Sequence, residues 1–264
     1  MLLNLRRSKI LKEIFENNFE KYKSPEKYDE MYGNYQDDLL YILEYVSETE
    51  KPIIELACGT GRLAIPMAKR GLNMVGIDLH DGMLSRAKQK AAREQVNIIF
   101  EQQDCTELDL DYKSPLIFMT GNSFQHFLTN ESQDALLHSV KKHLLPNGQF
   151  IFDTRNPNIA ELSVEQEFEE SYVNNDNQTV IEKHFETYNH ETQILHCATH
   201  TKLIENGQLA YTENDSISLR FVYPMELYRL LDSHGFEPIH LYGSWKKDTF
   251  VKDSISMVVH CRLK

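Results

Sequence analysis

The chain has 264 residues, 41% of them hydrophobic and 26% charged, and this length predicts one large domain or one domain with a sizeable elaboration. Collagen-like, low-complexity and largely disordered proteins are excluded, because only 11 glycines and 8 prolines are present. The 28 basic and 40 acidic residues give a net charge of −12, which would repel a phosphate backbone. Duplex nucleic acid is therefore not an expected partner.

The four cysteines lie far apart without a CxxC pair, so neither a zinc ribbon nor a disulfide framework is expected, and no metal site is predicted. The N-terminus has a short apolar start followed by arginines, which differs from a secretory signal. No segment approaches the roughly 20 apolar residues of a membrane span. We expect a cytoplasmic protein in a reducing compartment, without a membrane partner.

Residues 8–22 and 36–48 space their apolar side chains as amphipathic helices do, ahead of the main fold. Short apolar runs then alternate with helical stretches, one at about 81–94 and one at 130–145, where Asn130 with Gln133 is the expected N-cap. The apolar runs are 52–57, 74–78, 96–100, 115–120 and 150–153. Strands that are almost continuously apolar and alternate with helices indicate a parallel sheet covered on both faces.

The alternation of apolar runs and helical stretches is interrupted from about Ile159 to Phe221. Polar and apolar residues interleave there around a hairpin-type Asn206-Gly207 turn. The pattern predicts an antiparallel insertion. A helix from Pro224 to His234 and two strands, 238–243 and 254–262, complete the chain.

The segment Glu55-Leu-Ala-Cys-Gly59-Thr-Gly61-Arg-Leu-Ala64 leads from a strand through glycines into a helix. Glycines let the backbone approach a ligand closely, and a helix N-terminus supplies free N–H groups. The spacing also satisfies the dinucleotide fingerprint, so an NAD-dependent oxidoreductase is an open alternative. Pro66 falls inside the predicted helix, in conflict with its helix propensity.

Three acids help to choose between the ligands. Asp78 ends the second strand, where it suits a ribose diol of either cofactor, and Asp104 follows the third strand. Glu55 would lie close to a pyrophosphate, where like charges repel strongly in a partly dry site. S-adenosylmethionine offers an ammonium and a sulfonium and no phosphate, so Glu55 favours that ligand.

Over roughly residues 28–264 the chain resembles the class I S-adenosylmethionine-dependent methyltransferases. Residues 55–61 resemble the first motif of that family, with Ala57 in place of its usual first glycine, and residues 145–153 resemble the entry to its fifth strand. Residues 76–84 resemble the second motif, and 103–105 the third. The resemblance implies cofactor contacts by Glu55, Ala57, Gly59, Gly61, Asp78, Leu79, Met83, Asp104 and Cys105.

In those motifs Asp78 would hold both ribose hydroxyls, Leu79 would lie against the adenine with Met83 nearby, and Asp104 would accept from the adenine amino group. Tyr28 and Tyr32 resemble a tyrosine pair that covers the cofactor, although ordinary helix packing would also explain them. Asn122, after the fourth strand, is a candidate cofactor or substrate contact or a plain turn former.

The fold that the resemblance implies is α/β: a Rossmann-like, doubly wound, seven-stranded sheet of order 3-2-1-4-5-7-6, its last strand antiparallel, with an antiparallel β insertion. Residues 1–50 would then be helices covering the site, 51–158 and 222–264 the methyltransferase core, and 159–221 the substrate-binding part.

His126 is the candidate catalytic base, because histidine has the side-chain pKa nearest neutrality, although a packing role fits it equally well. The expected activity is methyl transfer from S-adenosyl-L-methionine to N, O or S of a small molecule. The alternatives are the NAD-dependent oxidoreductase and a non-catalytic S-adenosylmethionine-binding module. The acceptor and the oligomeric state are not predicted.

Overall fold

The computed structural model describes Asn18 and residues 22–46, 51–174 and 176–264. The chain forms two compact units. One unit comprises residues 22–156 and 222–264, and the other contains Asn18 and residues 157–221. The helix expected over residues 8–22 lies outside the described residues except for Asn18 and Tyr22. None of the described helices combines the length and the apolar character that a membrane crossing needs.

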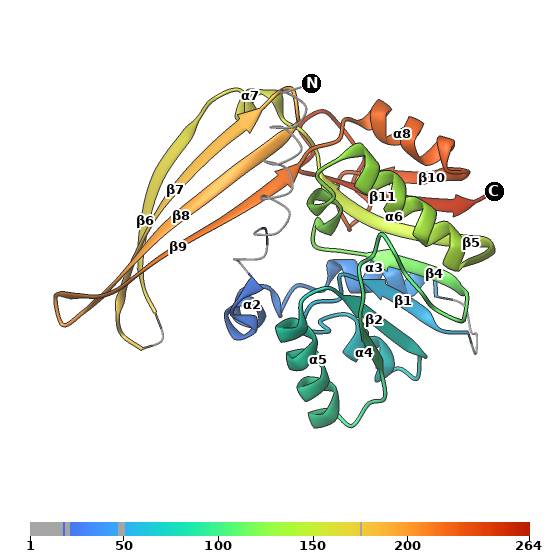
Figure 1. Cartoon of the computed structure of the whole chain (residues 1–264), viewed down its shortest axis with the longest axis horizontal. Coiled ribbons are helices and arrows are strands. Elements are labelled where there is room, and N and C mark those ends of the chain that lie inside the picture. Colours follow the sequence, from blue (N-terminus) through green and yellow to red (C-terminus); the bar gives the residue numbers. More distant parts are fainter. Residues whose placement is uncertain (1–17, 19–21, 47–50, 175) are drawn as a thin grey trace, which may run out of the picture. The chain divides into compact units, whose positions relative to one another are not determined.

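The larger unit is built on a seven-stranded sheet of order β3-β2-β1-β4-β5-β11-β10 (Figure 1). Only β11 runs antiparallel to its neighbours, β5 and β10. The predicted order and the antiparallel last strand are therefore confirmed. The strands are β1 (Ile53–Leu56), β2 (Met74–Asp78), β3 (Ile99–Gln102), β4 (Ser114–Met119), β5 (Leu144–Arg155), β10 (Phe236–Tyr242) and β11 (Ser256–Leu263).

Seven helical segments belong to this unit among the described residues. Six are α-helices and η2 is a 3₁₀ turn. They are α2 (Pro25–Tyr32), α3 (Asp37–Glu44), α4 (Ala64–Ala68), α5 (Asp81–Arg93), η2 (Ser123–His126), α6 (Asn130–His143) and α8 (Pro224–Ser233).

Pro66 is the third residue of the short α4. A proline in the first turn removes an N–H that has no partner within the helix, which resolves the conflict with propensity.

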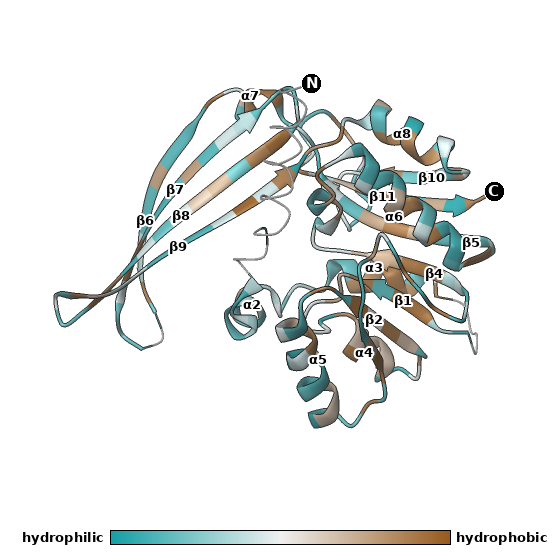
Figure 2. Ribbon diagram, in the orientation of Figure 1, coloured by the Kyte–Doolittle hydropathy of each residue, from teal (hydrophilic) through white to brown (hydrophobic). Residues whose placement is uncertain are grey.

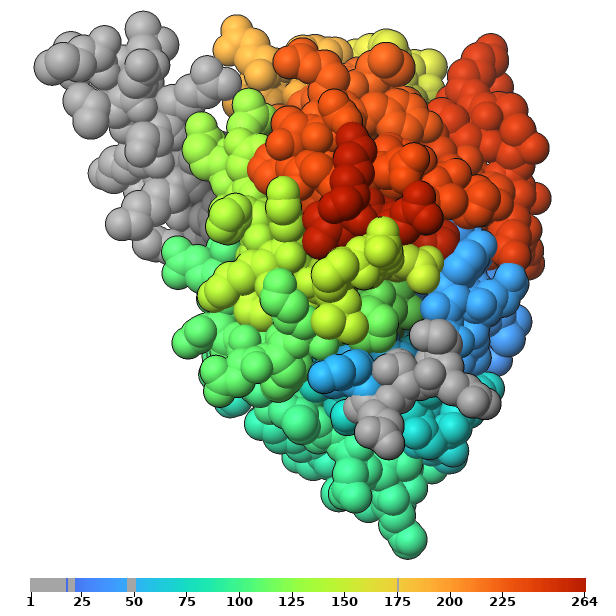
Figure 3. Space-filling model, turned by 90° about the vertical axis from the view of Figure 1, so that its right-hand side faces the viewer, coloured from blue at the N-terminus to red at the C-terminus, as the bar shows by residue number. Residues whose placement is uncertain are grey.

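The sheet buries both faces, as its continuously apolar strands require. Ile53 packs on the face covered by α3 and α4, while Ile54 packs on the face covered by α6 and α8. Figure 2 shows these central strands as the most hydrophobic part of the unit. In Figure 3 the C-terminal residues lie between those of the α8–β10 segment and those around the start of β5, in agreement with the strand order.

The smaller unit is an antiparallel sheet of order β6-β7-β8-β9, so the predicted antiparallel insertion is confirmed. Its core contains Leu162, Leu195 and Phe221. Asn206 and Gly207 have φ of 51° and 77°, as a primed hairpin turn requires. The elements are α7 (Ile159–Leu162), β6 (Gln166–Val173), β7 (Thr179–Asn189), β8 (Ile194–Glu205) and β9 (Gln208–Arg220).

The N-cap of α6 differs from the prediction. Thr129, not Asn130, caps the helix, because its hydroxyl accepts from the Ser132 N–H at 3.1 Å and Ser132 bonds back to the Thr129 N–H. The helix expected over 130–145 ends at His143, and residues 146–148 lie inside β5, where Asn147 has φ of 62° and the register with β4 shifts. Both differences concern the ends of α6, which begins after Thr129 and stops two residues earlier than expected.

Thr129→Ala should lower the free energy of unfolding by about 1 kcal/mol, because it removes this reciprocal cap. Denaturant titration measures the change. Asn130→Ala is the matched control and should cost less than Thr129→Ala. The opposite ranking would show that the cap lies at Asn130 after all.

Candidate cofactor site

Parallel pairing brings the carboxyl ends of β1, β2 and β4 to one edge of the sheet, with Leu56 opposite both Ile77 and Met119. The chain leaves β1 through left-handed positions at Ala57 (φ 51°), Gly59 (54°) and Gly61 (76°). Ala57 holds a conformation that favours glycine, at a cost on the order of 1 kcal/mol. This explains how alanine replaces the usual glycine without changing the loop.

Asp78 lies at the end of β2 and fixes this loop. Its Oδ2 accepts the Gly59 N–H at 2.7 Å, and its Oδ1 accepts the His80 N–H at 2.8 Å. Burial raises the pKa of Asp78, although these two backbone hydrogen bonds oppose the shift. His80 in turn accepts the Met83 N–H at 3.2 Å and so caps α5.

Glu55, on β1, is 3% exposed, and its Oε2 has no hydrogen-bond partner among the described residues. Burial raises its pKa to about 8, while the charge of Arg62 opposes this shift. Arg62 is itself held by Asp38, with an Nη1–Oδ1 distance of 2.9 Å, and by the Tyr35 carbonyl at 2.8 Å. Glu55 is thus a buried acid with an unsatisfied oxygen, which a cationic group such as the ammonium of S-adenosylmethionine would satisfy.

The residues predicted to surround the adenine differ in exposure. Leu79 is 44% exposed, which leaves its side chain free to lie against a flat ring. Met83 and Cys105 are buried, and burial raises the pKa of the Cys105 thiol to about 12, so it is not a thiolate at neutral pH. Asp104 is exposed, and its Oδ1 accepts from both the N–H and the hydroxyl of Thr106, each at 2.8 Å.

Asn122 follows β4 with φ of 58°, and its N–H donates to Asp153 Oδ1 at 2.9 Å. The Oδ1 of Asn122 is buried and has no hydrogen-bond partner among the described residues. The Trp245 indole donates to the other Asp153 oxygen at 3.1 Å, and burial raises the pKa of Asp153 to about 7. Asp153 therefore fixes the backbone that carries Asn122.

His126 ends η2, and its Nε2 lies 2.8 Å from the Tyr22 hydroxyl. Burial lowers the pKa of His126 to about 4, so the imidazole is neutral at pH 7. Ring centroids are 6.1 Å apart for Tyr22 and Tyr28, and 4.9 Å apart for Tyr28 and Tyr32. A Cβ built on Gly59 would lie 3.9 Å from the Tyr28 ring. Contacts from His126 to Tyr22, and from Tyr22 to Tyr28, therefore lead to the glycine loop.

The sequence predictions omit several residues of this region: Tyr22, Asp29, Asp38, Arg62 and Asp153. Each has a partner at least 20 positions away in the chain, and such pairing leaves no local spacing signal.

The insertion also brings together ligand atoms of Glu170, Glu182 and His184 within 4.8 Å of one another. A hydrogen bond of 3.2 Å between His184 Nε2 and Glu170 Oε1 accounts for that cluster.

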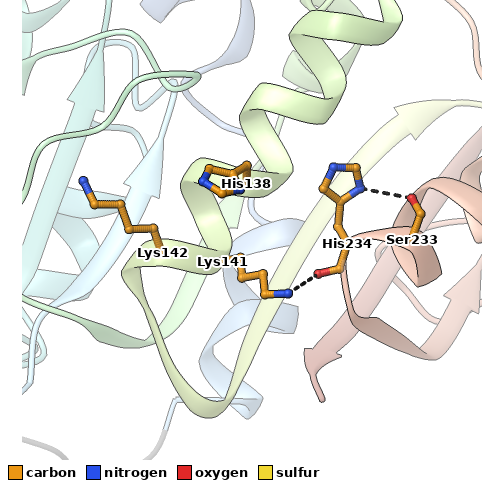
Figure 4. A pocket seen from close by; sticks show the side chains of 5 residues that line it. All are labelled: His138, Lys141, Lys142, Ser233 and His234. Atoms are coloured by element: carbon orange, nitrogen blue, oxygen red, sulfur yellow. Dashed lines mark hydrogen bonds between the residues drawn. The ribbon is translucent and has the colours of Figure 1, made fainter.

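A hollow elsewhere in the larger unit contains none of the predicted site residues (Figure 4). It lies where α6 ends before β5 begins, away from the carboxyl ends of the strands. In it, Lys141 donates to the His234 carbonyl at 3.0 Å. His138, Lys141, Lys142, Ser233 and His234 line it.

A family model described as a methyltransferase domain matches residues 53–148, from β1 into β5. The Bacillus subtilis (strain 168) protein named "Putative methyltransferase YqeM" is 30% identical over 188 residues, or 70% of this chain and 73% of its own length. The chain belongs to the class I S-adenosylmethionine-dependent methyltransferases. Its cofactor is S-adenosylmethionine, and the oxidoreductase alternative is not supported.

Solved structures share the fold of this methyltransferase. A Clostridium acetobutylicum S-adenosylmethionine-dependent methyltransferase has a TM-score of 0.77 at 18% identity, covering 90% of this chain and 98% of its own. The sugar N-methyltransferase KedS8 of a Streptoalloteichus species has a TM-score of 0.70 at 16% identity, with 92% and 94% coverage.

The high pKa of Glu55 predicts that binding of S-adenosylhomocysteine releases a proton near neutral pH, because the ligand ammonium favours the charged carboxylate. Affinity should therefore rise with pH until about pH 8. Calorimetry in two buffers of different ionisation enthalpy measures both quantities. Glu55→Gln should abolish the proton release and Asp81→Asn should not. Proton release that persists in Glu55→Gln would assign it to another group.

Proposed function

We propose that this methyltransferase transfers the methyl group to a nitrogen, oxygen or sulfur atom of a small molecule, with His126 as proton acceptor. The observation that carries this proposal is the half-buried Tyr22–His126 pair, joined through Tyr28 to the glycine loop. It supplies a neutral base beside the candidate cofactor position. A proton acceptor of this kind fits an acceptor molecule that arrives with a proton on its nucleophile.

We propose that the candidate cofactor residues contact different parts of S-adenosylmethionine. Glu55 would bind the ammonium group, Asp78 the ribose hydroxyls and Asp104 the adenine amino group. Leu79, Met83 and Cys105 would form the apolar surface beside the adenine, and Ala57, Gly59 and Gly61 would give the backbone close access. Tyr28 and Tyr32 would cover the site, and the unsatisfied Asn122 carboxamide would face the methionine moiety or the acceptor.

S-adenosylmethionine, when bound, supplies an activated methyl group whose sulfonium is already a good leaving group. The protein contributes mainly position and the exclusion of water, and such effects reach about 7–11 kcal/mol in favourable intramolecular models. His126 would take the proton of the acceptor as the nucleophile attacks. Its lowered pKa keeps the imidazole neutral, and Tyr22 orients the ring.

An amine is the acceptor class that we favour among these nucleophiles. The net charge of −12 attracts cations and repels anionic acceptors. A protonated amine must first lose a proton to a base, which His126 would provide, before its nitrogen can attack the methyl group. KedS8, a sugar N-methyltransferase, shares this fold. We propose that residues 159–221 and the N-terminal residues select the acceptor, because they are additions to the cofactor-binding scaffold.

The direct test incubates the protein with methyl-labelled S-adenosylmethionine and matched panels of small amines, alcohols and thiols, and follows label transfer by mass spectrometry. Labelled products among the amines would support the proposal in full. Label found on alcohols or thiols alone would contradict the amine preference. Label found only on protein or nucleic acid added to the mixture would contradict a small-molecule acceptor.

His126→Gln should lower turnover by about 10²-fold, because it removes a general base, while the Kd of S-adenosylhomocysteine changes little. Tyr22→Phe should cause a smaller loss, since the imidazole stays in place. His138→Gln, which changes an exposed histidine of α6, is the matched control and should keep full activity. Unchanged turnover in His126→Gln would assign this histidine to packing.

A further inference from the structure

Helix α2 lies next to the glycine loop although none of its eight residues is buried. Figure 2 shows it as mostly hydrophilic. A helix this short is marginal by itself, since isolated helices below about 12–15 residues are unstable in water. Contacts with the rest of the unit must therefore hold α2 in place, and charged hydrogen bonds are among them.

Asp29 makes those polar contacts at the centre of α2. Its Oδ1 accepts from the Thr60 hydroxyl and from Lys90 Nζ, each at 2.6 Å, and its Oδ2 accepts from Arg86 Nε at 2.9 Å. Lys90 Nζ also lies 3.2 Å from the Thr60 hydroxyl. One carboxylate thus joins three elements: α2, the cofactor loop that contains Thr60, and α5.

The surroundings of Asp29 are arranged to favour its charged form. Arg86 and Lys90 are four residues apart on α5, so both face the same side of that helix. Burial would raise the pKa of Asp29, but hydrogen bonds from Lys90, Thr60 and Arg86 outweigh it and lower the pKa. Glu26, also on α2, lies 3.7 Å from Arg86 and adds a second, more exposed ion pair.

The residue that this contact positions is Tyr28, the neighbour of Asp29. A Cβ built on Gly59 would lie 3.9 Å from the Tyr28 ring, and one built on Gly121 would lie 4.0 Å from its hydroxyl. Tyr28 therefore spans the loops that follow β1 and β4. Any movement of α2 that uncovers Gly59 must break the contacts of Asp29.

We propose that Asp29 is a positioning residue, an ionic latch that holds Tyr28 over the glycine loop and sets the rate at which the cofactor product leaves. This inference rests on the proposed position of the cofactor at that loop. Because movement of α2 must break the contacts of Asp29, release is limited by these charged hydrogen bonds. Those bonds are screened by salt, so release is sensitive to ionic strength.

The test measures the dissociation rate of S-adenosylhomocysteine by stopped-flow displacement. Asp29→Asn should raise this rate about tenfold, the scale expected for weakened hydrogen bonds to a charged group. The KM for S-adenosylmethionine should rise, while the single-turnover transfer rate stays within about twofold. Glu30→Gln, the same charge change on an exposed residue of the same helix, is the matched control and should leave the rate unchanged.

Lys90→Met tests the latch from the other side, since Lys90 is placed in no proposed ligand contact and lies on α5. It should also speed release, and Asp29→Glu should recover part of the slow release. Raising the salt concentration from about 0.05 M to about 0.5 M should speed release from the natural protein more than from Asp29→Asn.

Release that stays within twofold of the natural rate in both Asp29→Asn and Lys90→Met would overturn the latch. So would release that loses no salt sensitivity in Asp29→Asn. These outcomes are separate from a failure of the proposed function, because product release is measured without any methyl acceptor.

Discussion

The hydrogen bond of 2.7 Å from the Gly59 amide to the Asp78 carboxylate joins the loop after β1 to the end of β2. Parallel pairing of Glu55 with Gly76 sets the two strand ends side by side, so the bond needs no long side chain. Gly76 permits this approach, because a Cβ there would lie 2.8 Å from both Cys58 Sγ and the Phe100 ring. The placement of the loop glycines, and of every ligand contact proposed for them, depends on this constraint.

The site that surrounds this bond is rich in acids, and its cation Arg62 is paired with an acid. Arg62 is engaged by Asp38, and its charge only partly offsets the burial that raises the pKa of Glu55. Burial also raises the pKa of Asp78 and Asp153. Such a site favours a ligand that brings positive charge, as the ammonium and sulfonium of S-adenosylmethionine do, and disfavours a pyrophosphate. The electrostatics and the family assignment therefore agree on the cofactor.

Much of this could be predicted from the sequence, because strand order and the glycine loop depend on local patterns. Continuous apolar runs identified the sheet, and Asp78 was recognised by its position at a strand end. The N-cap of α6 was placed one residue too late, since Thr129 and Asn130 are both good capping residues and only geometry decides. Asp29 and Asp153 were missed because their partners, such as Lys90 and Trp245, come from distant segments.

The most direct measurement is calorimetric titration of the natural protein and of Asp78→Ala with S-adenosylhomocysteine. If Asp78 joins the loop to the ligand, the natural protein binds and the variant loses about 1.5–3 kcal/mol of binding free energy, the range for hydrogen bonds to a charged group, while its circular dichroism stays native. An unchanged Kd in a folded Asp78→Ala protein would contradict the central claim that this acid organises the cofactor site.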